Sequence, residues 1–291
     1  MTTLGAVFLP YLPPERLKAV VRAADEAGLE ELWFWEDCFR EGGITMAAAA
    51  LAWSDRMRVG VGLLPVPLRN VALTAMELSS LFRLFPGRAE IAIGHGVQDW
   101  MGQVGVRAAS PMTLLREYAG ALRSLLNGER VDAAGRYVRL DGVALDWPPP
   151  AGAAKVLVGA SGPRTMELSG EVADGTVLTA GLEPDAVRQA LRTIDAGRAK
   201  AGRTDPHKLV VYLHAATGPD ADRRMEAERV KWGYTNTLDA IVTGDAHAVA
   251  AGVRRWAEAG ADTVVLQPTP DDPDPEGFMR FVAHEVRPLV A

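Results

Sequence analysis

Residues 155–175, KVLVGASGPRTMELSGEVADG, combine residue types and spacing that suit anion binding. Residues 156–158 predict a short buried strand, which runs into a Gly-Ala-Ser-Gly-Pro corner and then into a helix. Glycine lets such a corner approach a ligand closely, and Pro163 suits the first turn of a helix. The unpaired N–H groups at the start of that helix attract a phosphate, to which Ser161 adds a hydroxyl and Arg164 a positive charge. The stretch indicates a phosphate site, and a plain turn is the alternative.

Two other predicted strands end in side chains that can exchange protons. Asp37 follows the apolar segment 31–35, and His95 stands between Gly94 and Gly96 after the segment 90–93. Histidine changes charge near neutral pH and is a common general acid or base. We therefore predict Asp37 and His95 as catalytic residues. The alternatives are a solvated loop carboxylate and an ordinary polar contact.

Glycines inside a third predicted strand indicate close approach of another group. In Val-Gly-Val-Gly-Leu-Leu-Pro, residues 59–65, Gly60 and Gly62 weaken the strand, as glycines at a bulge or a ligand contact do. A flat ring lying against this backbone would explain both, and packing beneath a neighbouring element would also do so. Gln98 and Trp100, after the fourth strand, offer an amide and a flat surface to such a ring.

Other kinds of chemistry find no support in the residues. The chain has one cysteine, Cys38, and its histidines show no metal-ligand spacing, so we predict no metal site. A GxSxG motif, which marks a serine hydrolase, is absent from the sequence.

Composition points to a packed globular protein that acts on small molecules. Hydrophobic residues make up 48% of the 291 residues and charged residues 23%, and the formal net charge is −6. The scattered basic residues argue against nucleic acid and against a membrane surface as partners. One cysteine fits a reducing compartment, and we find no signal peptide and no apolar run long enough to span a membrane. We therefore expect a soluble cytoplasmic protein.

Predicted strands and helices alternate along almost the whole chain. The predicted strands span residues 4–9, 31–35, 57–64, 90–93, 156–158, 176–178, 209–215 and 263–266. The predicted helices span residues 14–27, 44–53, 72–85, 112–126, 164–173, 185–201, 221–230 and 247–259. Right-handed crossovers make a closed α/β barrel, (β/α)8, the simplest arrangement. A doubly wound open sheet competes, but no GxGxxG motif opens the first crossover.

One long connection interrupts this alternation, at about residues 127–154. Two short segments flank Asp141-Gly142, a dipeptide suited to a type I′ hairpin turn, and Trp147-Pro-Pro-Pro follows. We predict an inserted hairpin and connector within one domain that spans residues 1–291. Residues 232–243 are a second candidate insertion.

These segments together resemble the luciferase-like monooxygenase superfamily, in particular its coenzyme F420-dependent (deazaflavin) oxidoreductases. The resemblance covers most of the chain, from GAVFLP at residues 5–10 to AGADTVVLQP at 259–268. Its most specific motifs are PGR-x-x-I-x-I-G, GASGP and VADG. FMN-using relatives are similar at the level of the barrel, whereas the GxSGP…ADG form looks like the deazaflavin branch.

The resemblance implies a TIM barrel that holds a deazaflavin at the carboxyl ends of its strands. It implies a bulge with a non-proline cis peptide behind the ring, at the segment Gly62–Leu64, and a phosphate held after the fifth barrel strand. The residues expected to bind the cofactor are Gly62, Leu63, Leu64, Gly94, Gly96, Gln98, Trp100, Gly159, Ala160, Ser161, Gly162, Arg164 and Thr165.

Two positions depart from the pattern of the family. Cys38 stands where some sugar-phosphate dehydrogenases have histidine, and Val97 and Gln98 stand where a carboxylate is common. The sequence therefore favours an F420-dependent oxidoreductase that acts on a small organic substrate other than a sugar phosphate. The alternatives are an FMN-dependent two-component monooxygenase and an F420-binding carrier or sensor without turnover. The resemblance also implies a possible homodimer.

Overall fold

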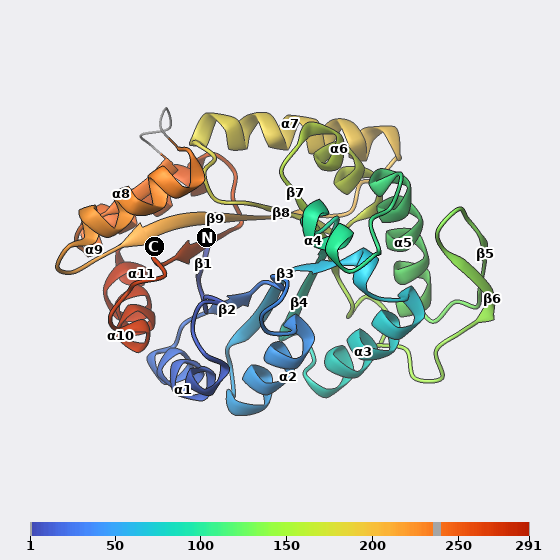
Figure 1. Cartoon of the computed structure of the whole chain (residues 1–291), viewed down its shortest axis with the longest axis horizontal. Helices are drawn as coiled ribbons and strands as arrows, with labels where there is room; N and C mark the ends of the chain where they lie inside the picture. The colour runs from blue at the N-terminus through green and yellow to red at the C-terminus, as the bar shows by residue number, and fades with distance from the viewer. Residues whose placement is uncertain (1, 235–239, 291) are drawn as a thin grey trace.

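Eight parallel strands close into a barrel in the computed structural model, which describes residues 2–234 and 240–290. In barrel order these strands are β1 (Thr3–Val7), β2 (Glu31–Phe34), β3 (Arg58–Pro65), β4 (Ala89–Gly94), β7 (Val156–Ala160), β8 (Gly175–Leu178), β9 (Lys208–Ala216) and β11 (Thr263–Gln267). Closure comes from the parallel pairing of β1 with β11 and of β9 with both β11 and β8. The predicted TIM barrel is therefore confirmed, with helices around its outside (Figure 1).

The carboxyl-terminal half of β9 carries an additional parallel strand. Its first half pairs with β8 as far as Val211, and β10 (Ile241–Thr243) then pairs along the same edge from His214 onward. The second candidate insertion thus contributes a strand beyond the predicted eight. Its central residues, 235–239, lie outside the described part of the chain.

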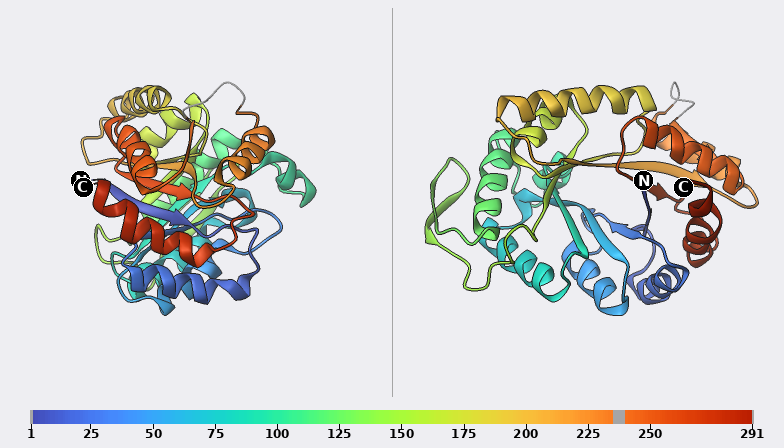
Figure 2. Two further views of the ribbon diagram at one scale, coloured as in Figure 1. Left: turned by 90° about the vertical axis from the view of Figure 1, so that its left-hand side faces the viewer. Right: turned by 180° about the vertical axis from the view of Figure 1, so that it is seen from behind.

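Amphipathic helices surround the barrel (Figures 1 and 2). They are α1 (Leu17–Ala27), α2 (Gly43–Trp53), α3 (Val71–Leu84), α4 (Gln98–Gln103), α5 (Pro111–Leu126), α6 (Pro163–Val172), α7 (Pro184–Lys200), α8 (Ala221–Trp232), α9 (Ala246–Glu258), α10 (Pro275–Arg280) and α11 (Arg287–Val290). Helix α1 illustrates the rule, because its buried residues Leu17, Val20, Val21 and Ala24 repeat at three- and four-residue intervals. Gly28, in the left-handed conformation with φ of 79°, ends it.

Large aromatic side chains fill the inside of the barrel. The rings of Trp33 and Tyr212 meet edge to face, with centroids 6.0 Å apart. A Cβ atom on Gly60 would lie 2.2 Å from Cδ2 of Trp33, so this glycine makes room for the indole. Packing, the alternative considered for the third-strand glycines, therefore accounts for Gly60.

Charged residues close the end of the barrel at which the strands begin. Lys208 Nζ lies 3.0 Å from Glu31 Oε1 and 2.5 Å from Glu90 Oε2, and Arg58 donates to Glu31 as well. Glu31 is 1% exposed, and its ion pairs outweigh the cost of burial, so the pKa of its carboxyl lies below the usual range. This network is paired internally and leaves the opposite end of the barrel for a ligand.

The inserted segment forms an antiparallel hairpin of β5 (Val131–Ala134) and β6 (Arg139–Val143), but its turn is not at Asp141-Gly142. The prediction of that turn was wrong, because the chain reverses at residues 135–138. There Glu117 of α5 accepts hydrogen bonds from the backbone N–H groups of residues 136–138. Gly142 instead lies inside β6 and donates its N–H to Asp132 Oδ1.

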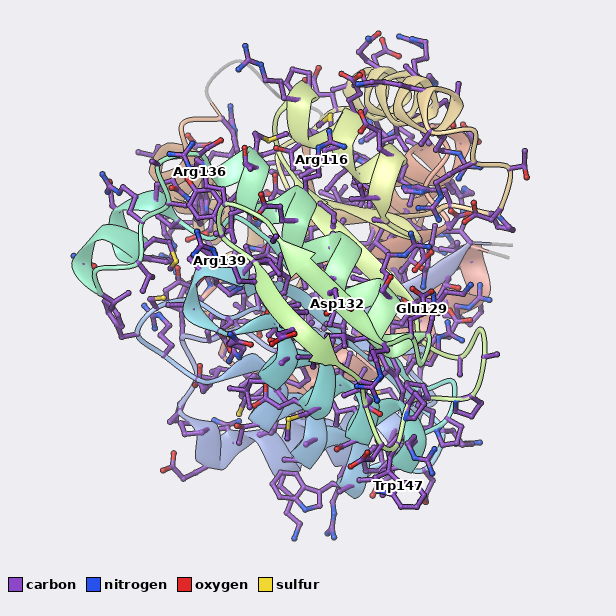
Figure 3. The ribbon with its side chains drawn as sticks, turned by 90° about the vertical axis from the view of Figure 1, so that its right-hand side faces the viewer. Arg116, Glu129, Asp132, Arg136, Arg139 and Trp147 are labelled. Carbon is purple, nitrogen blue, oxygen red and sulfur yellow. The ribbon has the colours of Figure 1, made fainter. Side chains whose placement is uncertain are left out.

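The hairpin lies across the outer side of α5, with Arg136 and Arg139 toward one end and Glu129 toward the other (Figure 3).

None of the helices in the described part of the chain is long and apolar enough to cross a membrane.

Candidate functional site

A cavity of about 430 Å³ opens where the barrel strands end. Residues of four strands, β3, β7, β9 and β11, and of the loops that follow β1, β2, β4 and β8 line it, so it lies where TIM-barrel active sites are found. Its walls contain Tyr11, Trp35, Glu36, Asp37, Gly62, Leu63, Pro65, His95, Gly96, Val97, Trp100, Gly159, Ala160, Ser161, Thr165, Thr179, Ala180, Tyr212, His214, Trp232, Tyr234 and Gln267.

One wall is the corner between β7 and α6. Helix α6 begins at Pro163 directly after this corner, and Ser161 and Thr165 both line the cavity. The side chain of Thr165 is buried, whereas Ser161 is exposed. Two hydroxyls beside the first turn of a ten-residue helix suit an anionic group. Arg164 is exposed and does not line the cavity.

His95 lies against this same corner. Its Nε2 atom is 3.2 Å from Thr165 Oγ1, and its Nδ1 atom is buried without a hydrogen-bond partner in the described residues. Burial lowers the pKa of His95 and so favours the neutral imidazole. The backbone of Pro111 has a smaller effect in the opposite direction. Gln98 does not reach the cavity wall. Its amide donates to the backbone oxygens of His95 and Gly96 and holds this loop in place.

The floor of the cavity is the end of β3. The peptide bond between Gly62 and Leu63 is cis, and the pairing of β3 with β4 shifts by one residue between Gly62 and Leu64. Both the bulge and the non-proline cis peptide are therefore confirmed. Leu63 lies against Gly159, where a Cβ atom would come within 2.3 Å of Leu63 Cδ2. Leu64 points the other way and is 2% exposed in the core.

The loop after β2 places two carboxylates with different surroundings. Glu36 lies in an ion pair with Arg69, in which Nη1–Oε1 is 2.5 Å and Nη2–Oε2 is 2.7 Å, and it accepts from the N–H of Gly43. Asp37 is half-buried on the cavity wall. Burial raises the pKa of its carboxyl, and the opposing effects of Trp35, Arg40 and Lys231 are smaller. Asp37 is therefore the carboxylate better placed to gain or lose a proton.

The structure brings together ten of the fifteen predicted site residues around this cavity. These ten are Asp37, Gly62, Leu63, His95, Gly96, Trp100, Gly159, Ala160, Ser161 and Thr165. Leu64, Gly94, Gln98, Gly162 and Arg164 lie beside these residues in the chain without lining the cavity. Gly94 is buried beneath Leu63, since a Cβ atom there would lie 2.5 Å from Leu63 Cδ2.

Sequence reasoning missed the opposite wall, which contains Tyr212, His214, Trp232, Tyr234 and Gln267. A usable signal existed for His214, because it lies near the end of a predicted strand, as Asp37 and His95 do. Trp232 is the last residue of α8 and Tyr234 follows that helix, so both lie far along the chain from the end of β9.

A second cavity, of about 490 Å³, lies between the start of α3 and the turn of the inserted hairpin. Arg69, Arg107 and Arg139 line it, and none of the predicted site residues does.

Within residues 2–234 and 240–290, no group of three or more histidine, cysteine or acidic side chains is arranged to hold a metal ion.

Residues 3–269 match the model of the luciferase-like monooxygenase family, so the chain belongs to that family. It is 30% identical over 221 residues to a 5,10-methylenetetrahydromethanopterin reductase of Methanolobus tindarius, a match that covers 76% of this chain and 66% of that protein. It is 28% identical to an F420-dependent glucose-6-phosphate dehydrogenase of Nakamurella multipartita, over 74% of this chain and 68% of the relative.

Solved structures share the fold. The coenzyme F420-dependent tetrahydromethanopterin reductase of Methanopyrus kandleri superposes with a TM-score of 0.84 at 20% identity, covering 100% of this chain and 99% of the other.

Proposed function

We propose that this protein is an F420-dependent oxidoreductase that transfers a hydride between the deazaflavin and a small organic substrate. The observation that carries the proposal is one cavity that joins a flat seat to an anion-binding corner. The seat is the bulge at Gly62–Leu63, and the corner contains Ser161 and Thr165 at the start of α6.

The residues present fit a deazaflavin. Glycine at 159 lets Leu63 lie flat on the cavity floor, because any larger residue would displace that side chain. The hydroxyls of Ser161 and Thr165 and the N-terminus of α6 can hold a phosphate. When bound, the cofactor supplies the acceptor or donor of two electrons and a proton equivalent as hydride.

The protein's own contribution is orientation, exclusion of water and one proton. We assign Asp37 and His95 to the proton, since both line the cavity and both have displaced pKa values. Gly96 and Trp100 complete the wall beside the ring. One relative named above is a methylenetetrahydromethanopterin reductase and another is an F420-dependent glucose-6-phosphate dehydrogenase, so the substrate is the variable part of the assignment.

Equilibrium binding tests the proposal. We expect the purified protein to bind F420 at least tenfold more tightly than FMN, measured by fluorescence titration of each. Replacing both Ser161→Ala and Thr165→Val should weaken F420 binding about a hundredfold or more, because each change removes a hydrogen bond to a charged group, which contributes roughly 1.5–3 kcal/mol. Ser80→Ala, an exposed hydroxyl on α3, is the matched control.

Three results would count against the proposal. Preferential binding of FMN would favour the two-component monooxygenase. Unchanged F420 affinity in the double variant would remove the phosphate site. Tight F420 binding without any turnover across alcohols, aldehydes, ketones and imines would favour a carrier or sensor.

We also infer a homodimer, formed through the outer face of α3 in the ring of helices (Figure 1). Leu73, Met76 and Leu84 are 47%, 58% and 70% exposed and lie on one side of α3. Clustered exposed apolar side chains of this size are typical of an interface. Sedimentation velocity should give a dimer for the wild type and a monomer for Met76→Glu. A monomeric wild type would refute the inference.

A further inference from the structure

The inward face of β9 lies directly opposite the cavity floor. Strand β9 is four positions from β3 in the eight-stranded barrel order, so the two strands face each other across its axis. Alternation along β9 turns Val210, Tyr212 and His214 inward, and Tyr212 Oη lies 3.4 Å from the carbonyl oxygen of Gly62. His214, one step further toward the mouth, therefore faces the space above Gly62–Leu63.

His214 is buried in this wall, and one of its ring nitrogens has no hydrogen-bond partner in the described residues. It is 1% exposed, it lines the cavity, and its Nδ1 atom has no hydrogen-bond partner in the described residues. The Tyr234 ring lies beside it at a centroid distance of 5.8 Å, but the Tyr234 hydroxyl donates to the Ala180 carbonyl. Buried imidazoles are normally hydrogen-bonded, so an unpartnered one on a cavity wall indicates a missing ligand.

The surroundings of His214 are aromatic and carry little net charge. Burial lowers the pKa of His214 to about 4, with Glu228 raising it and Lys231 lowering it, so the imidazole is neutral at pH 7. Glu228 and Lys231 form an ion pair of 3.2 Å with each other. The Lys231 ammonium also lies over the rings of Tyr11 and Trp232, at 4.8 Å and 5.2 Å from their centroids.

We propose that His214 hydrogen-bonds the reacting oxygen of a neutral, ring-bearing alcohol or ketone. This proposal rests on the function proposed above, because the substrate must lie between His214 and a deazaflavin seated on Gly62–Leu63. Tyr11, Trp35 and Trp232 supply flat apolar surfaces for the ring of the substrate. An anionic substrate would place its charge against aromatic rings and a lysine already paired with Glu228.

The neutral imidazole suits either direction of the reaction. In one tautomer the ring nitrogen that faces the substrate accepts a hydrogen bond from an alcohol hydroxyl. In the other tautomer the same nitrogen donates one to a ketone oxygen. His214 then touches the substrate from β9, and His95 reaches the same cavity from the loop after β4, beside Thr165.

Calorimetric titration of the F420-loaded protein tests the proposal with two defined probes, acetophenone and benzoate. Acetophenone has a ring and a neutral carbonyl, and benzoate has the same ring with a negative charge. His214→Leu removes the hydrogen bond and His214→Gln keeps an amide in its place. His207→Gln is the matched control. His207 is half-buried, and burial lowers its pKa to about 4 as it does for His214, but it bonds to Thr176 at the other end of the barrel.

We expect saturable acetophenone binding at least tenfold tighter than benzoate binding. His214→Leu should weaken it tenfold or more, and His214→Gln should stay within threefold of the wild type. F420 affinity, titrated separately, should change less than twofold in all variants, and His207→Gln should change neither affinity.

Several outcomes overturn the proposal while F420 still binds. These are an absence of saturable acetophenone binding, a preference for benzoate, an unchanged affinity in His214→Leu, or an equal loss in His207→Gln. An F420 affinity that falls in parallel with that for acetophenone would place His214 in the cofactor site. Failure of the wild type to bind F420 at all is a different result, which refutes the proposed function instead.

Discussion

The Nε2 atom of His95 lies 3.2 Å from the Oγ1 atom of Thr165, which joins the loop after β4 to the first turn of α6. The two residues are 70 positions apart and come from neighbouring barrel strands, since β4 pairs with β7. This contact places the histidine at the corner between β7 and α6. A residue predicted from its own strand end thus belongs to the same subsite as the Gly-Ala-Ser-Gly-Pro motif.

Thr165→Val should weaken F420 binding by about tenfold, because it removes a hydroxyl from the phosphate corner and the partner of His95. Thr165→Ser keeps the hydroxyl and should bind within threefold of the wild type. Fluorescence titration measures both. If the valine variant binds F420 as tightly as the wild type, the phosphate is held elsewhere.

Asp37→Asn should stabilise the protein at neutral pH. The pKa of the folded-state carboxyl lies above its ordinary value, so the ionised form is less favourable in the folded than in the unfolded chain. The folded protein therefore loses stability as the pH rises through the pKa of the unfolded-state carboxyl and then that of the folded-state carboxyl. Asparagine carries no such charge and avoids that loss. We expect a melting temperature about 2 °C higher at pH 7.

The gain from Asp37→Asn should shrink as the pH is lowered from 7 toward 4, where the wild-type carboxyl becomes protonated. Thermal melts at both pH values check the sign. A variant less stable than the wild type at pH 7 would mean that the Asp37 carboxylate holds the loop after β2.

The ion pair of Glu36 and Arg69 should show strong coupling in stability. The two side chains are 7% and 19% exposed and are held by two hydrogen bonds. Glu36→Gln or Arg69→Met alone leaves a buried charge without its partner and should cost about 3 kcal/mol of unfolding free energy. The double variant should cost much less than the sum of the two.

Urea unfolding of the four proteins in this cycle measures the coupling energy. The exposed pair Arg188–Asp185 is the control, and Arg188→Met should leave stability almost unchanged. Additive effects of the two buried substitutions would show that Arg69 is held mainly by Glu77, whose Oε2 atom is 3.7 Å away.

Two glycine-to-alanine changes should separate packing from binding. In Gly60→Ala the new methyl group would meet the indole of Trp33, a ring inside the core, and should cost about 2–3 kcal/mol of stability. In Gly159→Ala it would meet only the end of the Leu63 side chain, which can rotate into the cavity. That variant should lose less stability than Gly60→Ala but about tenfold in F420 affinity.

Urea unfolding and F420 titration of both variants test this distinction. Gly120→Ala on α5 is the control, because a Cβ atom there has nothing within 4 Å. Equal losses of stability in the two variants, with F420 affinity unchanged in Gly159→Ala, would show that Leu63 is not part of the ring seat.

The alternation of apolar strands with amphipathic helices predicted a parallel sheet and favoured the closed barrel, which buries eight such strands beneath one outer layer of helices. Local chemistry was also enough for the corner at Gly159–Gly162. There the glycines, Ser161 and Pro163 specify a turn and a helix start within a few residues.

The position of the hairpin turn depended on tertiary contacts. Asp141-Gly142 has the local preference for a turn, yet Glu117 of α5 binds three backbone N–H groups at residues 136–138 and fixes the reversal there. A side chain on another element outweighed the dipeptide.

The sequence by itself determined the order of the strands, the position of the corner between β7 and α6 and the residues at each strand end. Only the closed barrel decided that Gly60 accommodates Trp33 and that the Tyr212 hydroxyl reaches Gly62 from the opposite strand. It also decided that His214 faces the cavity floor. The physical reason is distance along the chain. Gly62 and Tyr212 are 150 residues apart, and no local pattern of residues encodes which side chains meet across the axis of a barrel.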